Sequence, residues 1–224
     1  SGKWGFFWSS LRFMGSYSLY LVVERIRGRQ GIVYSIDMDT FSFVATLLSG
    51  MPCFFETHGG KAMTRINKIF FERIKGAVVI NNIIREQIHT TLGTFKEKMI
   101  VEPNGIDLEL FRATSKDIAR KKLSIPSDRK IVMYCGRFYG WKGLEVLADA
   151  VALLPKGVFV YIVGGTKEEF LKVISRSEIS ENLVFPGEQP YAEIPTWLSS
   201  ADGLLVLGTK HDDQSYYYTS PMKI

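Results

Sequence analysis

The sequence predicts an α/β fold with two domains, each built on a parallel sheet. Three observations support this prediction. Short apolar runs of strand length alternate with longer amphipathic segments along the chain. Most of these runs end on glycine or on a polar residue, as strands do where a loop begins. The pattern then occurs a second time, after a polar and charged stretch from residue 112 to 129.

The first segment, from Trp4 to Val23, is rich in Phe, Trp, Tyr and Leu. Arg12, several serines and two glycines interrupt it, and no cleavage site of small residues precedes Glu24. A spanning helix needs about 20 mostly apolar residues. We therefore expect a buried or interfacial helix here and not a membrane span.

The rest of the first half alternates strands with helices. The expected elements are a strand in GIVYSID, a helix in FSFVATLLSG, a strand in MPCFFETHGG, a basic amphipathic segment over 64–74, a strand in GAVVINN, a helix over 84–92 and a strand in KMIVEPNGID. This order predicts a parallel sheet that is covered by helices on both faces.

The second half repeats the order after a helix in DIARKKL. Its expected elements are KIVMYCG, GVFVYIVGG, NLVFPG and GLLVLG as strands, and GLEVLADAVALL, KEEFLKVISR and AEIPTWLSSA as helices. We place the domain boundary so that the two domains cover residues 1–112 and 113–224.

Composition and charge exclude several classes of protein. The two cysteines, Cys53 and Cys135, lie in apolar runs, which argues against a disulfide framework and favours a cytoplasmic location. The three histidines are far apart, so a structural zinc site has little support. The net charge of +5 suits anionic ligands or membranes. Nucleic acid is not expected as a partner, because the aromatic residues fall mostly within apolar strands and helices.

The loop GRFYGWKG, after the first strand of the second half, carries the strongest chemical signal. Gly136 allows a tight turn, and Gly143 opens a helix whose free N–H groups attract an anion. Arg137 and Lys142 add a guanidinium and an ammonium, a combination suited to a diphosphate. The alternative is a surface loop with two solvated bases.

Four segments together resemble the retaining glycosyltransferases of GT-B architecture, in particular family 4. They are Pro103–Asp107 followed by Phe111, Gly136-Arg137 with Lys142-Gly143, VFPGEQPYAEIPTWLSSADGLLVL, and the terminal residues 220–223. The resemblance implies two Rossmann-like domains that face a cleft. Both are expected to be truncated at their outer termini, because the family's first strand and glycine-rich loop precede the region matched here.

The resemblance also implies a chemistry. Arg137 and Lys142 would bind the donor diphosphate and stabilise the charge that grows on it as the glycosidic bond breaks. The donor would be a UDP- or GDP-linked sugar, transferred with retention and without a metal or other cofactor. The acceptor would be a glycan or a lipid-linked molecule, in the synthesis of surface polysaccharide or glycoconjugate.

Further site residues follow from the same resemblance. His58 would lie in the first-half wall of the cleft, with Glu56 as a weaker candidate beside it. The donor would be bound by Gly136, Gly164, Gly165, Gln189, Tyr191, Ser220 and Lys223. Asn104 and Gly105 would form the interdomain hinge. As alternatives, His58 could merely close a strand, and paired glycines after a strand are often only turns.

Three alternative readings stay open at this point. Asp37-Met38-Asp39 has the spacing of a divalent-metal site. The basic segment 61–75 could pack on the sheet or lie on an anionic membrane as a peripheral anchor. The whole protein could also be a non-catalytic nucleotide-binding or membrane-docked partner, since Tyr218 stands where the family carries an acidic residue and the family's later glutamate is not found.

Overall fold

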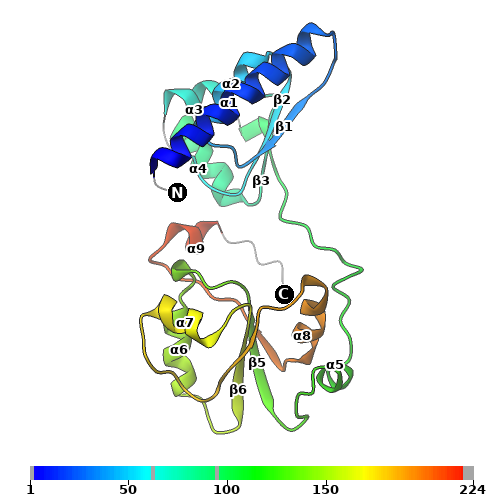
Figure 1. Ribbon diagram of the computed structural model, residues 1–224, viewed down its shortest axis with the longest axis vertical. Helices are drawn as coiled ribbons and strands as arrows, with labels where there is room; N and C mark the ends of the chain where they lie inside the picture. The colour runs from blue at the N-terminus through cyan, green and yellow to red at the C-terminus, as the bar shows by residue number, and fades with distance from the viewer. Residues whose placement is uncertain (1–2, 62–63, 94–95, 219–224) are drawn as a thin grey trace. The chain divides into compact units, whose positions relative to one another are not determined.

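The computed structural model describes residues 3–61, 64–93 and 96–218. The chain consists of two compact units, Ser1–Asn104 and Gly105–Ile224 (Figure 1). Each unit is an α/β structure with one four-stranded parallel sheet, as the sequence predicts. Residues 105–112 belong to the second unit, where Phe111 packs edge-on against Tyr191 with ring centroids 5.4 Å apart. The division therefore lies a few residues before the boundary placed after residue 112.

Unit 1 has its strands in the order β1-β2-β3-β4. Its elements are α1 (Lys3–Ile26), β1 (Val33–Ile36), α2 (Thr40–Ser49), β2 (Cys53–Thr57), α3 (Arg65–Arg73), β3 (Gly76–Val79), α4 (Asn82–Leu92), the 3-10 turn η1 (Lys96–Lys98) and β4 (Met99–Val101). Side chains fix several helix ends. Thr64 accepts from the N–H of Asn67 at the start of α3, and Asn81 accepts from the N–H of Ile84 at the start of α4.

Only one face of the unit 1 sheet is covered by the described helices. Each strand is added on the same side of its predecessor, so right-handed crossovers place α2, α3 and α4 on one face. The other face bears Tyr34, Ile36 and Ile100, which are 50%, 55% and 57% exposed. The expectation of cover on both faces is wrong for this part of the chain, because a strand order that never reverses cannot supply it.

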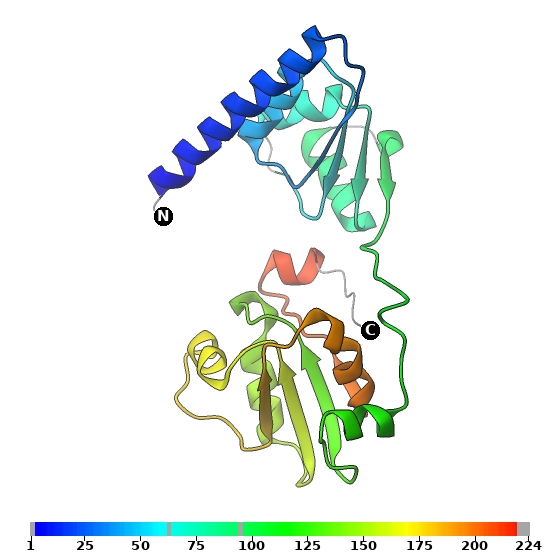
Figure 2. The same cartoon turned by 45° about the vertical axis from the view of Figure 1, so that its right-hand side comes forward.

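The covered face is built around four aromatic rings. Phe43 of α2, Phe55 of β2 and Phe70 and Phe71 of α3 are buried, and the rings of Phe43 and Phe70 stack with centroids 3.9 Å apart. The aromatic residues of the basic segment 61–75 therefore pack on the sheet, which is one of the two alternatives predicted for that segment. Helix α1 packs against α2 along the outside of this layer (Figures 1 and 2).

Unit 2 has the strand order β7-β6-β5-β8. Its elements are α5 (Lys116–Lys122), β5 (Lys130–Cys135), the 3-10 turn η2 (Gly140–Lys142), α6 (Leu144–Ala152), β6 (Val158–Val163), α7 (Lys167–Ile174), β7 (Leu183–Gly187), the 3-10 turn η3 (Tyr191–Glu193), α8 (Ile194–Ser200), β8 (Gly203–Leu205) and α9 (Asp213–Tyr217). The strands run outward from β5 to β7, and β8 then returns to the other side of β5.

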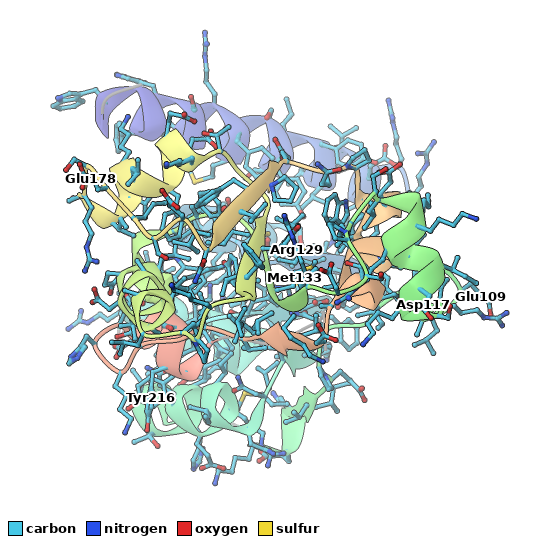
Figure 3. All side chains as sticks on the ribbon, turned by 90° about the horizontal axis from the view of Figure 1, so that it is seen from below. Glu109, Asp117, Arg129, Met133, Glu178 and Tyr216 are labelled. Atoms are coloured by element: carbon cyan, nitrogen blue, oxygen red, sulfur yellow. The ribbon has the colours of Figure 1, made fainter. Side chains whose placement is uncertain are left out.

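This reversal gives unit 2 a core on each face of its sheet. One core joins α6 and α7 to the strands and is centred on Leu144, Ile162 and Phe170. The other joins α8 and includes Met133, which is 1% exposed and lies on β5 (Figure 3). The point of reversal lies between β5 and β8. Open α/β sheets bind ligands beyond the carboxyl ends of the strands at such a point.

Candidate functional site

The loop between β5 and α6 lies beside the reversal point of the unit 2 sheet. The N–H of Gly136 donates to the carbonyl of Val163 at 2.9 Å, which continues the pairing of β5 with β6. The hydroxyl of Tyr134 donates to the carbonyl of Arg137 at 3.1 Å and holds the turn from below. Gly143 has φ +71°, a conformation that favours glycine, and α6 begins directly after it.

Aromatic rings surround the ammonium of Lys142. Its Nζ atom lies 5.3 Å from the ring centroid of Trp141, 5.4 Å from that of Tyr139 and 5.9 Å from that of Tyr134. The rings of Tyr139 and Trp141 are themselves stacked. Ring faces attract a cation, so the three rings hold the ammonium of Lys142 in position beside the loop. The same Nζ atom lies 3.3 Å from the point where a Cβ at Gly136 would stand.

The side chain of Arg137 lines a groove of about 440 Å³ on the β6 side of the loop. The groove is also lined by Phe138, Tyr139, Gly164, Gly165, Glu169, Lys172, Val173 and Glu188. Arg137 is exposed, whereas Lys142 is half-buried. The structure therefore brings Arg137 together with Gly164 and Gly165, as predicted for a shared site, and places Lys142 against the adjoining Gly136.

Two glycines let the loops after β5 and β6 approach each other. Gly164 has φ +128°, and a Cβ there would lie 2.5 Å from the carbonyl oxygen of Gly136. A Cβ on Gly165 would lie 2.5 Å from the ring of Phe138. These distances are too short for any side chain. The paired glycines are therefore required for a close approach of two loops and are more than a turn.

The N-terminus of α6 faces the same region. Its N-cap residue is Gly143, and no side chain caps the helix there. A Cβ on Gly143 would lie 3.3 Å from the carbonyl oxygen of Gly208, so the loop after β8 runs close by. By contrast, α7 is closed by a capping box in which Thr166 and Glu169 bond each other's backbone N–H groups. The first N–H groups of α6 therefore have no capping side chain, unlike those of α7, and can bind an anion.

Gln189 and Tyr191 have other contacts. The Nε2 of Gln189 donates to the carbonyl of Pro186 at 2.8 Å, and its Oε1 accepts from Nε1 of Trp197 at 3.2 Å. Tyr191 is 60% exposed and packs against Phe111. Neither residue lines the groove, and Glu188 lines it instead. Glu188, Glu169 and Lys172 also line the groove and were not predicted from the sequence, although Glu188 directly precedes Gln189.

His58 lies at the carboxyl end of β2, between two carboxylates of unit 1. Its Nε2 is 2.8 Å from Oε1 of Glu56, and its Nδ1 is 3.5 Å from Oδ2 of Asp37. The hydroxyl of Tyr34 donates to the other oxygen of Glu56. The structure thus brings His58 and Glu56 together, as the spacing of two along a strand predicts. Asp37 completes the arrangement from β1.

The two carboxylates of Asp37-Met38-Asp39 serve different hydrogen bonds. Asp37 accepts from the N–H of His58 at 2.9 Å, whereas Asp39 accepts from the N–H and hydroxyl of Ser42 at the start of α2. Within residues 3–61, 64–93 and 96–218, no group of three or more His, Cys, Asp and Glu side chains is placed to hold a metal ion. In this structure Asp37 therefore holds the backbone at His58, and Asp39 holds the start of α2.

Two pKa shifts describe the electrostatics at this edge of unit 1. The pKa of Glu56 is lowered, first by the hydrogen bond from Tyr34 and then by that from His58. The pKa of Lys61 is lowered by burial, and the nearby charges of Asp37 and Asp39 oppose that effect. The ammonium of Lys61 also lies over the ring of Phe55, 5.3 Å from its centroid. A polar cluster with both signs of charge therefore follows β1 and β2.

The remaining predicted residues fall at the ends of the units. The division between the units passes between Asn104 and Gly105, the residues expected to form a hinge. Ser220 and Lys223, which were expected to bind the donor, lie outside the described residues.

Comparison with known proteins agrees with the resemblance stated from the sequence. Residues 115–210 match the family described as Glycosyl transferases group 1. The D-inositol 3-phosphate glycosyltransferase of Mycolicibacterium smegmatis is 27% identical over 132 residues, which are 56% of this chain and 30% of that relative. D-inositol 3-phosphate glycosyltransferase 1 of Catenulispora acidiphila is 27% identical over 135 residues, 54% and 32% of the two chains. The chain spans about a third of the length of these curated relatives.

Solved structures share the fold. Sucrose-phosphate synthase of Thermosynechococcus elongatus has a TM-score of 0.69 at 18% identity, covering 97% of this chain and 57% of that one. HepE of Anabaena, in complex with UDP, has a TM-score of 0.67 at 18% identity, covering 86% and 56%. These comparisons confirm the fold class, an α/β chain of GT-B type with two parallel-sheet domains, and the resemblance to group 1 glycosyltransferases.

Proposed function

We propose that this chain, whose residues 115–210 match the group 1 glycosyltransferases, takes part in moving a sugar from a nucleotide diphosphate sugar to a carbohydrate or lipid-linked acceptor. The observation that carries the proposal is the loop between β5 and α6. It places Arg137, the caged ammonium of Lys142 and the start of α6 beside the reversal point of one sheet. That is where an open α/β sheet binds its ligand.

The chemistry of the loop fits a diphosphate leaving group. A guanidinium can bond two phosphate oxygens at once, while an ammonium supplies a point charge. Both would stabilise the negative charge that develops as the bond to the sugar breaks. With two cations in this role, we propose a transfer that needs no metal.

We further propose that transfer proceeds with retention. If the acceptor attacks from the face that the diphosphate leaves, a phosphate oxygen of the leaving group can take the acceptor's proton. In such a reaction the protein supplies position and charge, and no separate general base is needed.

His58 is proposed to recognise hydroxyl groups of a sugar. Glu56 and Asp37 contact its two ring nitrogens, and such contacts fix the orientation of an imidazole. Its side chain is 37% exposed, so a substrate hydroxyl can reach it. We assign it a substrate-positioning role in unit 1.

The donor is proposed to carry UDP or GDP. HepE of Anabaena, which shares the fold, has been solved in complexes with UDP and with UDP-glucose. Gly164 and Gly165 line the groove next to Arg137. Because glycine has no side chain, a nucleotide in the groove could contact the backbone there. We place the reaction in the cytoplasm, in the synthesis of surface polysaccharide or glycoconjugate.

Calorimetric titration with UDP, GDP and ADP, paired with an assay for hydrolysis or transfer of the matching sugars, tests the proposal. We expect UDP or GDP to bind more tightly than ADP. Arg137→Ala and Lys142→Ala should each weaken binding by roughly tenfold, the loss of one charge-assisted contact. Lys156→Ala, which removes an exposed cation elsewhere in unit 2, is the matched control and should bind as the wild type does.

The outcomes separate the two functions considered. Binding together with turnover, both lost in the loop variants, supports the enzyme. Binding without hydrolysis or transfer favours a non-catalytic nucleotide-binding partner of the same fold. If no nucleotide binds, or if both loop variants bind and turn over normally, the assignment of the loop is wrong.

A further inference from the structure

The groove beside Arg137 has four charged side chains in its lining, which are Arg137, Glu169, Lys172 and Glu188. Arg137 carries the guanidinium proposed for the diphosphate. The carboxylate of Glu169 accepts from the N–H of Thr166 at 2.8 Å and so belongs to the capping box of α7. Lys172 and Glu188 are then the two charged side chains of the groove for which neither the diphosphate nor a helix cap accounts.

Lys172 and Glu188 reach the groove from different elements. Lys172 lies in the last turn of α7, and Glu188 directly follows β7. Both residues are exposed, and no hydrogen bond or ion pair joins either side chain to another residue that the structure describes. An ammonium and a carboxylate therefore line one groove without neutralising each other. A ligand that lies between them can bond to both.

These two groups offer a ligand complementary hydrogen bonds. An ammonium only donates, and a carboxylate only accepts, through two oxygens at once. Guanine has the matching groups, because O6 and N7 accept while N1–H and the 2-amino group donate. Its two donors are adjacent, so both can bond to the oxygens of one carboxylate. The groove therefore holds polar groups for both kinds of edge that a guanine ring presents.

The bases uracil and adenine match these two groups less well. Uracil has a single N–H between two carbonyl oxygens, and those oxygens would repel a carboxylate at that edge. Adenine has an amino donor where guanine has O6, so it would set a donor against the ammonium of Lys172. A site built to hydrogen-bond one ligand discriminates strongly against another that leaves its polar groups unpaired. Lys172 and Glu188 thus favour guanine over both.

The rest of the groove suits the flat faces of a base. Phe138 and Val173 supply apolar surface on which a ring can pack. Gly164 and Gly165 have no side chains, so the ring can also approach the backbone there. The volume of about 440 Å³ lies within the range of roughly 300–1,000 Å³ that is typical of small-molecule sites. Because Arg137 lines the same groove, a nucleotide can contact the guanidinium with its diphosphate and the groove with its base.

Unit 2 has no excess charge that would attract every nucleotide alike. Residues 105–224 contain 15 Lys and Arg and 15 Asp and Glu. The net charge of +5 belongs to residues 1–104, which contain 13 Lys and Arg against 8 Asp and Glu. The affinity of unit 2 for a nucleotide must then come from local contacts, and contacts to the base decide among nucleotides.

We propose that the groove recognises guanine, and hence that the donor is a GDP-linked sugar. The carboxylate of Glu188 accepts from N1–H and the 2-amino group, and the ammonium of Lys172 donates to O6 or N7. The inference rests on the proposed function, since it names the nucleotide of the same donor site. It makes Glu188 and Lys172 the residues that determine donor specificity, while Arg137 and Lys142 bind the diphosphate of any nucleotide.

Calorimetric titration with GDP, UDP, ADP and IDP tests the inference. IDP is GDP without the 2-amino group, so it lacks one of the two donors assigned to Glu188. We expect GDP to bind at least about tenfold more tightly than UDP or ADP. IDP should bind about tenfold more weakly than GDP, because it leaves one carboxylate oxygen without its partner.

Two variants locate the contacts. Glu188→Gln has only one carbonyl oxygen to offer, so it should weaken GDP about tenfold and IDP little, and the two ligands should then bind alike. Lys172→Met removes the ammonium and should weaken GDP and IDP equally, by about three- to tenfold, since both carry O6 and N7. Glu178→Gln, which removes an exposed carboxylate outside the groove, is the matched control and should bind all four nucleotides as the wild type does.

The outcomes separate the base from the diphosphate. UDP that binds as tightly as GDP, equal binding of GDP and IDP by the wild type, or a Glu188→Gln variant that keeps the wild-type ratio of GDP to IDP affinity overturns the inference. If UDP binds more tightly and Arg137→Ala still weakens it, the diphosphate site stands and the assignment of the base alone is wrong. If none of the four nucleotides binds, the diphosphate site is wrong, and this inference falls with it.

Discussion

The close approach of the loops after β5 and β6 depends most on Gly164. Its φ of +128° and the 2.5 Å from its would-be Cβ to the carbonyl oxygen of Gly136 leave no room for a side chain. We expect Gly164→Ala to lower the free energy of unfolding by about 2–4 kcal/mol, through strain and overlap together. It should also weaken nucleotide binding, because it displaces the backbone at Gly136. Urea denaturation and calorimetric titration measure the two effects.

Gly157 provides the control for backbone strain alone. It has φ +90°, but nothing lies within 4 Å of a Cβ placed there. Gly157→Ala should cost only about 1 kcal/mol and leave nucleotide binding unchanged. Equal losses in the two variants would show that contact with Gly136 is unimportant.

Glu56 is a second residue whose behaviour the structure predicts. Its pKa is lowered chiefly by the hydrogen bond from Tyr34. Tyr34→Phe removes that donor and should raise the pKa of Glu56 toward its ordinary value, which NMR titration of the carboxyl carbon can follow. Tyr191→Phe, in the other unit, should leave the titration as it is. An unchanged pKa of Glu56 in Tyr34→Phe would contradict the hydrogen bond.

At this scale the sequence predicted positions better than contacts. Arg137 and Lys142 could be placed in one loop after a strand, because they follow an apolar run and lie next to glycines. The three rings around Lys142 could not be predicted, since one of them belongs to Tyr134, which lies within β5. Gln189 was predicted to bind the donor from the resemblance alone, whereas in the structure its side chain accepts from Trp197, and Glu188 beside it lines the groove.

Among the elements, α5 is tied to the sheet of unit 2 by a buried charge network. Arg120 is 3% exposed and donates to Asp202 at 2.8 Å and to the carbonyls of Ser200 and Ser127. Asp202 also accepts from Lys116 and from the N–H of Ile131. The network thus links α5, the end of α8 and the first residues of β5.

The network predicts a loss of stability in acid. The pKa of Asp202 is held below its ordinary value, first by Lys116 and then by the N–H of Ile131. A carboxyl group with a depressed folded-state pKa stabilises the fold above its unfolded pKa, roughly 3.9, and that stabilisation is lost as pH falls through the folded-state pKa. The wild type should therefore lose more stability below about pH 4 than Asp202→Asn does.

Denaturant unfolding at a series of pH values measures this difference. At neutral pH, Asp202→Asn should lower the free energy of unfolding by about 2–3 kcal/mol, because Arg120 is left buried without its counter-charge. Glu109→Gln, which removes the partner of the exposed Arg112, should change it by less than about 0.5 kcal/mol. Parallel acid curves for the wild type and Asp202→Asn would refute the role of Asp202.

The order of helices and strands could be predicted from the sequence, but which faces of the sheets are covered by helices could not. Apolar runs and their glycine ends mark strands locally, so nearly every expected element is found. Strand order depends on contacts between distant segments. Unit 2 reverses its order and covers both faces, while unit 1 does not reverse and leaves Tyr34 and Ile36 bare.

For the whole molecule, the two units differ in charge and in what they offer a ligand. Unit 1 carries the net charge of +5 and the polar cluster at His58. Unit 2 is neutral overall, and two of its cations, Arg137 and Lys142, lie in the loop after β5. From the sequence alone only the total charge is known, because the division of that charge between the units depends on where the boundary falls.

The central claim is that the loop after β5 binds a diphosphate, and a thermodynamic cycle tests it most directly. Titration compares a nucleoside diphosphate with its nucleoside, for the wild type and for Arg137→Ala/Lys142→Ala. We predict that the diphosphate adds at least about tenfold to the affinity of the wild type and little to that of the variant, whose affinity for the nucleoside is unchanged. The same gain from the diphosphate in both proteins would contradict the account.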